Sequence, residues 1–208
     1  MPSLVDVLLT IPALLVGLTF HEYAHALVAY KLGDPTAKNL GRLTLNPIKH
    51  LDPLGTIFLL VFRFGWAKPV PVNAFHFRGD RQKGMLWVSL AGPGSNLVMA
   101  VITAIIWKLV EPQGPILSAV LLNVFFINLI LAVFNIIPVP PLDGSKILAG
   151  VLPRRYSHVI FNLEKYGYVI LLLLMLFGIV GRVLMPVVQL LAAVITGVLG
   201  VESLQLYF

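Results

Sequence analysis

Long apolar runs recur along this chain, and they constrain its fold more than any other feature. Several of them are long enough to cross the hydrocarbon core of a bilayer as helices. Of the 208 residues, 58% are hydrophobic and only 12% are charged, which is about half the charged fraction of soluble domains. We therefore predict an all-α polytopic membrane protein in which residues 1–208 form a single membrane-embedded domain.

The apolar runs and the glycines and prolines between them predict about five transmembrane helices. These are expected at residues 3–31, 83–110, 116–137, 166–180 and 183–200. The first run lacks a basic leader and a small-residue cleavage site, so we expect a retained span. Residues 51–66 are too few to cross, which favours a re-entrant or interfacial hairpin. Segment 68–75 alternates and carries two prolines, as a short edge strand can.

Positive charge is concentrated in two polar segments of the chain. Segment 31–83 holds nine of the fifteen lysines and arginines, and segment 146–165 holds four more. The positive-inside rule makes both segments cytoplasmic. With five spans, this places the amino terminus outside and the carboxyl terminus in the cytoplasm. The net charge of +6 is then explained by the basic cytoplasmic loops between membrane spans, and we expect no nucleic-acid partner.

The first apolar run contains the pattern His21-Glu22-x-x-His25. On a helix, positions i and i+4 share one face, so both imidazoles can reach a single metal ion. Glu22 adjoins the first of them, where a carboxylate can take a proton from water activated by the metal. Zinc suits imidazole and carboxylate ligands, and the absence of cysteine excludes thiolate ligands. The alternative is a polar helix face that lines a pore or is satisfied by neighbouring spans.

A catalytic zinc site normally has three protein ligands, so one more is needed. Asp143 follows an apolar span broken by prolines, where a lone carboxylate needs a partner. Its alternative role is to cap the short helix predicted at residues 143–152. We favour Asp143 as the third ligand. Most of the other acidic candidates sit in polar loops or at span ends, where solvation explains them; the other candidates are Asp6, Asp34, Asp52, Asp80, Glu111 and Glu164.

Three segments, "FHEYAHALVAYKLGDP", "AGPGSN" and "NIIPVPPLDGSKIL", occur in this order. Together they resemble the site-2 protease family of intramembrane zinc metalloproteases, and the likeness is greatest to compact prokaryotic members. The resemblance implies that His21, His25 and Asp143 bind one Zn²⁺ and that Glu22 is the general base. It also implies hydrolysis of peptide bonds within or next to transmembrane segments in regulated intramembrane proteolysis.

Two asparagines complete the predicted site. By the resemblance, Asn135 supports catalysis and binds substrate, and Asn96 of "GPGSN" binds substrate. Physically, the amide of Asn135 could donate to the oxyanion that develops at the scissile carbonyl. For both residues the alternative is to satisfy backbone groups that the nearby prolines leave free. We expect transmembrane proteins as substrates and a regulatory membrane partner, since no PDZ or CBS-like domain is recognised.

Two other classes of protein remain open. Intramembrane His, Glu and Asp also mark ion pathways, so a metal-binding transporter is the main alternative. Such transporters more often carry paired repeats with a matched break in each half, and only one broken span is recognised here. A non-catalytic scaffold with a structural zinc is the third class. The intact Glu22 speaks against it, because a structural site needs no base.

Overall fold

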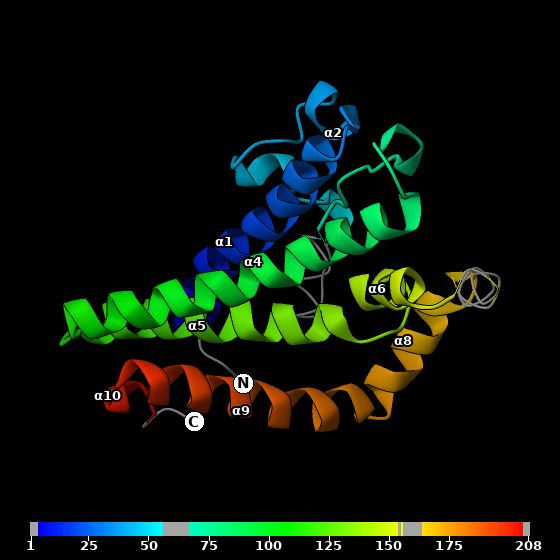
Figure 1. Cartoon of the computed structure of the whole chain (residues 1–208). Coiled ribbons are helices and arrows are strands. Elements are labelled where there is room, and N and C mark those ends of the chain that lie inside the picture. Colours follow the sequence, from blue (N-terminus) through cyan, green and yellow to red (C-terminus); the bar gives the residue numbers. More distant parts are fainter. Residues whose placement is uncertain (1–3, 56–66, 154, 156–163, 206–208) are drawn as a thin grey trace.

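The computed structural model describes residues 4–55, 67–153, 155 and 164–205 (Figure 1). Its four long helices are α1 (Leu4–Lys31), α4 (Arg81–Val110), α5 (Pro115–Ile136) and α9 (Ile179–Leu199). Its shorter helices are α2 (Thr36–Asn39), η1 (Pro47–Lys49), η2 (Ala74–His76), α6 (Asp143–Val151), α8 (Gly167–Leu176) and α10 (Glu202–Gln205). The prediction of an all-α polytopic membrane protein is confirmed.

The helices begin and end at capping residues, glycines and prolines. The Asp80 side chain caps α4 by accepting a hydrogen bond from the backbone N–H of Lys83. Helix α4 ends at Glu111, whose φ is 44°, and α5 restarts with Pro115 in its first turn. Gly178, with a φ of 68°, separates α8 from α9.

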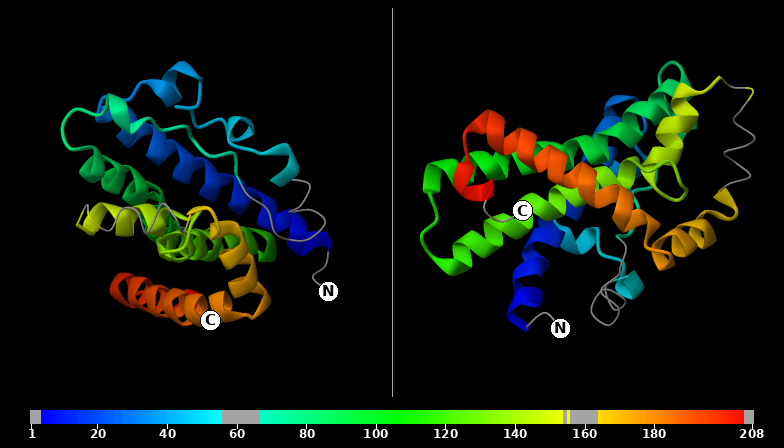
Figure 2. Two further views of the ribbon diagram at one scale, coloured as in Figure 1. Left: turned by 90° about the vertical axis from the view of Figure 1, so that its right-hand side faces the viewer. Right: turned by 90° about the horizontal axis from the view of Figure 1, so that it is seen from below.

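Helices α1, α4 and α5 pack against one another, while α9 lies along α5 and α6 lies along α4 (Figures 1 and 2). A buried cluster around Phe125, Leu129 and Val188 joins α5 to α9. Helix α1 approaches α5 closely at Gly17, where an added Cβ would lie 2.7 Å from Leu131 Cδ1. Small residues allow such close helix contacts within membranes, where packing rather than hydrophobic burial holds helices together.

The structure differs from the prediction of about five transmembrane helices at the fourth span, expected at residues 166–180. Within the described residues, four helices are long and apolar enough to cross a membrane, and Gly167–Leu176 is a shorter apolar helix. Helix α8 has 10 residues. At about 1.5 Å per residue it extends only about 15 Å, half of the roughly 30 Å hydrocarbon core. Hydropathy alone did not reveal that Gly178 would end the helix so early.

The number of spans changes the expected position of the carboxyl terminus. Lys108 Nζ near the end of α4 donates to the backbone carbonyl of Leu199 at 2.6 Å, so α9 ends beside the end of α4. Helix α1 is antiparallel to α4, because His25 meets Val88 while Gly17 meets Asn96. The start of α1, the turn after α4 and the end of α9 therefore share one side. This arrangement favours the two termini at the same end of the helix bundle, whereas five spans would place them on opposite sides.

The hairpin predicted at 51–66 lies for the most part outside the described residues. The edge strand predicted at 68–75 is not paired into a ladder within the described chain, where Leu51 and Ala67 form an isolated antiparallel bridge. Pro69 and Pro71 explain this, because neither can donate a hydrogen bond to a neighbouring strand. The segment instead lies along α1 and is attached to it through side chains.

Candidate metal centre

Helix α1 presents His21 and His25 on one buried face, as their i, i+4 spacing predicts. The two side chains belong to residues that are only 6% and 8% exposed. Their Nε2 atoms lie 3.0 Å apart, and their ring planes are nearly perpendicular. Both histidines sit well inside the Leu9–Lys31 stretch that is long enough to cross a membrane.

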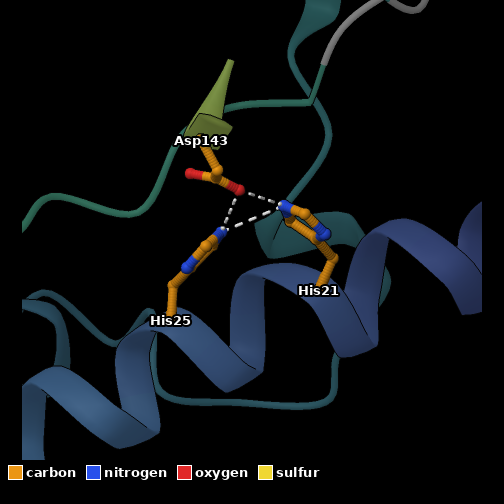
Figure 3. A group of neighbouring side chains, drawn as sticks. All are labelled: His21, His25 and Asp143. Carbon is orange, nitrogen blue, oxygen red and sulfur yellow. Dashed lines mark hydrogen bonds and ion pairs between the residues drawn. The ribbon is translucent and has the colours of Figure 1, made fainter. Parts of the chain in front are cut away.

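Asp143 meets both imidazoles from the first turn of α6 (Figure 3). Its Oδ2 lies 3.1 Å from His21 Nε2 and 3.0 Å from His25 Nε2. Gly144 makes this approach possible, because a Cβ there would lie 2.2 Å from the backbone carbonyl oxygen of Ile136. The prolines that end α5 and the glycine after Asp143 thus fold the chain back so that the carboxylate faces α1.

The hydrogen bonds at the far side of each ring determine where its proton resides. His25 Nδ1 lies 2.7 Å from the Val88 carbonyl oxygen, which can only accept, so Nδ1 carries the hydrogen. His21 Nδ1 lies 2.7 Å from Asn96 Oδ1, which also accepts. In the neutral imidazoles both Nε2 atoms therefore present lone pairs. A metal-binding histidine is typically held in this way by a partner behind the ring.

Three acceptor atoms thus converge without a hydrogen atom between them. Asp143 Oδ2 is buried and has no hydrogen-bond partner among the described residues. Such a cluster is unfavourable unless a cation lies within it. These three atoms can hold a metal ion, since all lie within 4.8 Å of one another. Ligands about 2.0–2.1 Å from a tetrahedral zinc lie about 3.3 Å apart, close to the distances seen here.

Gly92 of α4 packs closely against this cluster. A Cβ at this position would lie 2.4 Å from His25 Nε2 and 2.6 Å from His21 Nε2. Any larger residue would therefore press on the two atoms that face the metal position. The "GPG" of α4 serves close approach to the site, and α4 remains helical through Pro93.

Glu22 is buried and is held by the segment that follows the undescribed residues 56–66. Its Oε2 accepts a hydrogen bond of 2.8 Å from the backbone N–H of Val70. Val70 stands between Pro69 and Pro71, so it supplies the only N–H among these three residues. The two prolines also restrict the backbone on either side of Val70, so the Val70 N–H is presented to Glu22 by a stiff segment.

The two asparagines predicted for the site, Asn96 and Asn135, differ in burial and in hydrogen bonding. Asn96 is fully buried, and its amide is used by His21, by the Gly17 carbonyl and by Asn128. Its oxygen and its nitrogen are both engaged between the helices, and these contacts support a role in orienting His21; substrate binding by Asn96 stays a prediction. Asn135 is half-buried, and its Nδ2 donates to the Leu131 carbonyl of its own helix at 3.0 Å.

A second polar cluster anchors the 67–76 segment beyond the end of α1. Asp34 is fully buried and accepts hydrogen bonds from the Thr36 hydroxyl and from the backbone N–H of Asn73 at 2.7 Å. His76 Nδ1 lies 2.9 Å from Asp34 Oδ1, the oxygen that also accepts from Thr36. Burial raises the pKa of Asp34, but these hydrogen bonds outweigh burial and leave the pKa below its ordinary value.

Some residues of the site were not found by reasoning from the sequence. Asn128 carries no motif, and a polar residue in an apolar helix gave no indication that it would face Asn96. The Val88 carbonyl could not be found, because every residue has one. Gly92 does carry a signal in the sequence, since a glycine inside a helix costs stability and therefore often has a packing reason, such as close contact between helices.

Comparison with known proteins identifies the family of the chain. Residues 111–178, which include Asp143, match the profile of peptidase family M50. A candidate zinc metalloprotease of Bacillus subtilis, YwhC, is 46% identical over 184 residues, covering 85% of this chain and 84% of that protein. The chain belongs to peptidase family M50, the site-2 protease family. The resemblance inferred from the three sequence segments is thereby confirmed.

More distant relatives extend the family assignment to other organisms. A candidate zinc metalloprotease of Mycolicibacterium smegmatis, Rip2, is 30% identical over 84% of this chain and 69% of its own length. Another from Methanocaldococcus jannaschii, MJ0611, is 32% identical over 74% of each protein. No solved structure matches the chain significantly.

Proposed function

We propose that this chain, a zinc metalloprotease of peptidase family M50, hydrolyses peptide bonds within or next to the transmembrane segments of membrane proteins. The observation that carries the proposal is the convergence of His21, His25 and Asp143 on one point, with Glu22 beside the first ligand. Membership of a peptidase family and relatives named as zinc metalloproteases support the same chemistry.

Hydrogen bonds orient the two histidine ligands for metal binding. The two imidazoles present Nε2 lone pairs because Val88 and Asn96 accept the hydrogens on Nδ1. Asp143 adds one negative charge, which compensates part of the charge of Zn²⁺. When bound, zinc acidifies a water molecule and polarises the carbonyl group of the scissile bond.

Glu22 is proposed to act as the general base. Its carboxylate takes a proton from the attacking water and returns it to the amine that leaves. The hydrogen bond from the Val70 N–H limits the rotation of this carboxylate. A donor that is placed by two prolines needs little further ordering when the substrate binds.

A substrate from within the bilayer is supported by the depth of the site. The histidines lie inside a helix that is long enough to span, and the side chains around them are buried. A transmembrane substrate would have to unwind near the site, because helical amides are already hydrogen-bonded. Asn135 lies near the end of α5 and has one amide hydrogen in use, and its donation to the oxyanion stays a prediction.

Positive charge supports one orientation of the molecule. The basic segment 31–83 is proposed to be cytoplasmic, which places the turn after α4 outside the cell. Since α9 ends beside that turn, both termini are then proposed to be external. We also propose a prokaryotic cell membrane as the location, in line with the bacterial and archaeal relatives.

The function is tested with purified chain and a panel of peptides that contain transmembrane helices. The wild-type protein should cleave a subset of them when loaded with zinc. Glu22→Gln keeps the size of the side chain and the three ligands, so cleavage should fall by roughly 10²–10⁴-fold while zinc content is unchanged. Cleavage by Glu22→Gln at the wild-type rate would remove Glu22 as the base. No cleavage of any peptide by zinc-loaded wild type would oppose the proposal.

A further inference from the structure

A chain of buried hydrogen bonds runs from the metal centre into α5. His21 Nδ1 meets Asn96 Oδ1 at 2.7 Å, and Asn96 Nδ2 meets Asn128 Oδ1 at 3.0 Å. Asn128 Nδ2 in turn lies 2.8 Å from the Val124 carbonyl oxygen. Both asparagines are completely buried. The chain therefore connects α1, α4 and α5 in a region without solvent.

The Val124 carbonyl fixes the direction of every bond in this chain. It can only accept, so the nitrogen of the Asn128 amide must face it and the oxygen must face Asn96. Asn96 then donates from Nδ2 to Asn128 and also to the Gly17 carbonyl oxygen at 2.9 Å. With its nitrogen committed to two acceptors, Asn96 has only its oxygen to offer to His21.

The opposite arrangement would be unfavourable for binding a metal. A rotated Asn96 amide would place its oxygen against the Gly17 carbonyl and against Asn128 Oδ1, which leaves two contacts between acceptors. His21 Nδ1 would then accept, and its hydrogen would move to Nε2, which faces Asp143. A hydrogen on Nε2 blocks that atom as a ligand.

We propose that Asn128 is a positioning residue for the metal centre, because it holds the Asn96 amide in the orientation that keeps the His21 Nε2 lone pair free for metal. The inference rests on the proposed function, since it concerns the same site. Among the described residues the side chain of Asn128 hydrogen-bonds to Asn96 and to the Val124 carbonyl rather than to His21, His25 or Asp143, so it acts through Asn96. Partners behind a metal-binding histidine typically contribute about 10–100-fold to metal affinity.

The experiment measures the affinity of the purified full-length chain for Zn²⁺ by chelator competition. Asn96→Ala should weaken binding by about 10–100-fold, and Asn128→Ala should weaken it by about tenfold. If Asn128 acts through Asn96, the double variant should bind no more weakly than Asn96→Ala alone. A role in packing alone would not produce this lack of additivity in metal affinity.

Two further variants separate positioning from folding. Thr103→Ala removes a buried hydroxyl that donates to the Met99 carbonyl within α4, and it should leave zinc affinity unchanged. If Asn128→Ala does not fold, Asn128→Ser is the replacement. Its hydroxyl can still bond to its own helix but reaches less far, so zinc affinity should again fall while the melting temperature of the metal-free chain is kept.

Two results would overturn the inference on its own. The first is a folded Asn128 variant that binds zinc as tightly as wild type. The second is a double variant in which the losses of zinc affinity from Asn128→Ala and Asn96→Ala add fully. A wild-type chain that binds no zinc would instead overturn the proposed function and this inference with it.

Discussion

At the scale of the residue, glycines decide how closely the backbone approaches the proposed metal centre. Gly144 lets the first turn of α6 lie against the last carbonyls of α5, and Gly92 leaves space in front of the two Nε2 atoms. His21, His25 and Asp143 could be predicted because helix periodicity and a broken span place their side chains. Asn128 and the Val88 carbonyl could not, since their contacts depend on how separate helices pack.

Gly92→Ala should disable the centre without unfolding the chain. The new methyl group would lie 2.4 Å from His25 Nε2, so the ring must move away from the metal position. We expect zinc affinity to fall at least about tenfold, measured by chelator competition. Gly94→Ala is the matched control, because a Cβ there meets no atom within 4 Å. Equal zinc affinities in the two variants would show that the space in front of the imidazoles is not needed.

At the scale of the element, the segment after residue 66 is positioned by side chains rather than by strand pairing. Asp34 holds its distal end, and the Arg42 guanidinium donates to the Lys68 carbonyl at 2.6 Å near its start. Between them Val70 bonds to Glu22. Alternation in the sequence predicted a strand here, because periodicity does not reveal whether a neighbouring strand is present. The two prolines favoured the unpaired outcome.

Asp34→Ala should release this segment from α1. The substitution leaves the partly buried backbone N–H of Asn73 without its acceptor, and such a loss costs up to about 1–3 kcal/mol. We expect a lower melting temperature and faster hydrogen exchange at residues 67–76, with zinc affinity nearly unchanged. Unchanged exchange in this segment would contradict the anchoring role of Asp34.

The contribution of Asp34 should also depend on pH. Its pKa in the folded protein lies below the ordinary value of 3.8, because its hydrogen bonds favour the carboxylate. The stabilisation is therefore complete at pH values well above 4 and is lost as the pH falls through the lowered pKa. Melting curves of wild type and Asp34→Asn should converge on acidification below about pH 4. A difference that grows on acidification would have the wrong sign.

At the scale of the whole molecule, four long helices place the start of α1 and the end of α9 on one side. Hydropathy located every long helix within a few residues, since apolar spans are the strongest signal in such a chain. It overestimated the number of crossings, because α8 and α9 together read as two spans. Lys108 donates to the Leu199 carbonyl at the end of α9, and Trp107 donates to the Ser203 hydroxyl. These two hydrogen bonds place the end of α9 beside the end of α4.

Single cysteines test this topology, because the chain has none of its own. Cysteines at Gln113 and Ser203 should react with an impermeant reagent from the same side of the membrane. A cysteine at Asn39 should react only from the other side. We expect the first two to be labelled in intact cells and the third only after permeabilisation. If position 203 were labelled from the same side as position 39, the chain would have to cross the membrane once more than described here.

The zinc content of the purified chain tests the proposed centre most directly. Metal analysis of wild type and Glu22→Gln should each find about one zinc per chain, because both keep His21, His25 and Asp143. Asp143→Ala removes the carboxylate that lies 3.0 and 3.1 Å from the two imidazoles, and its zinc content should fall close to zero after dialysis against a chelator. Asp143→Ala that retains as much zinc as wild type would contradict the centre described here.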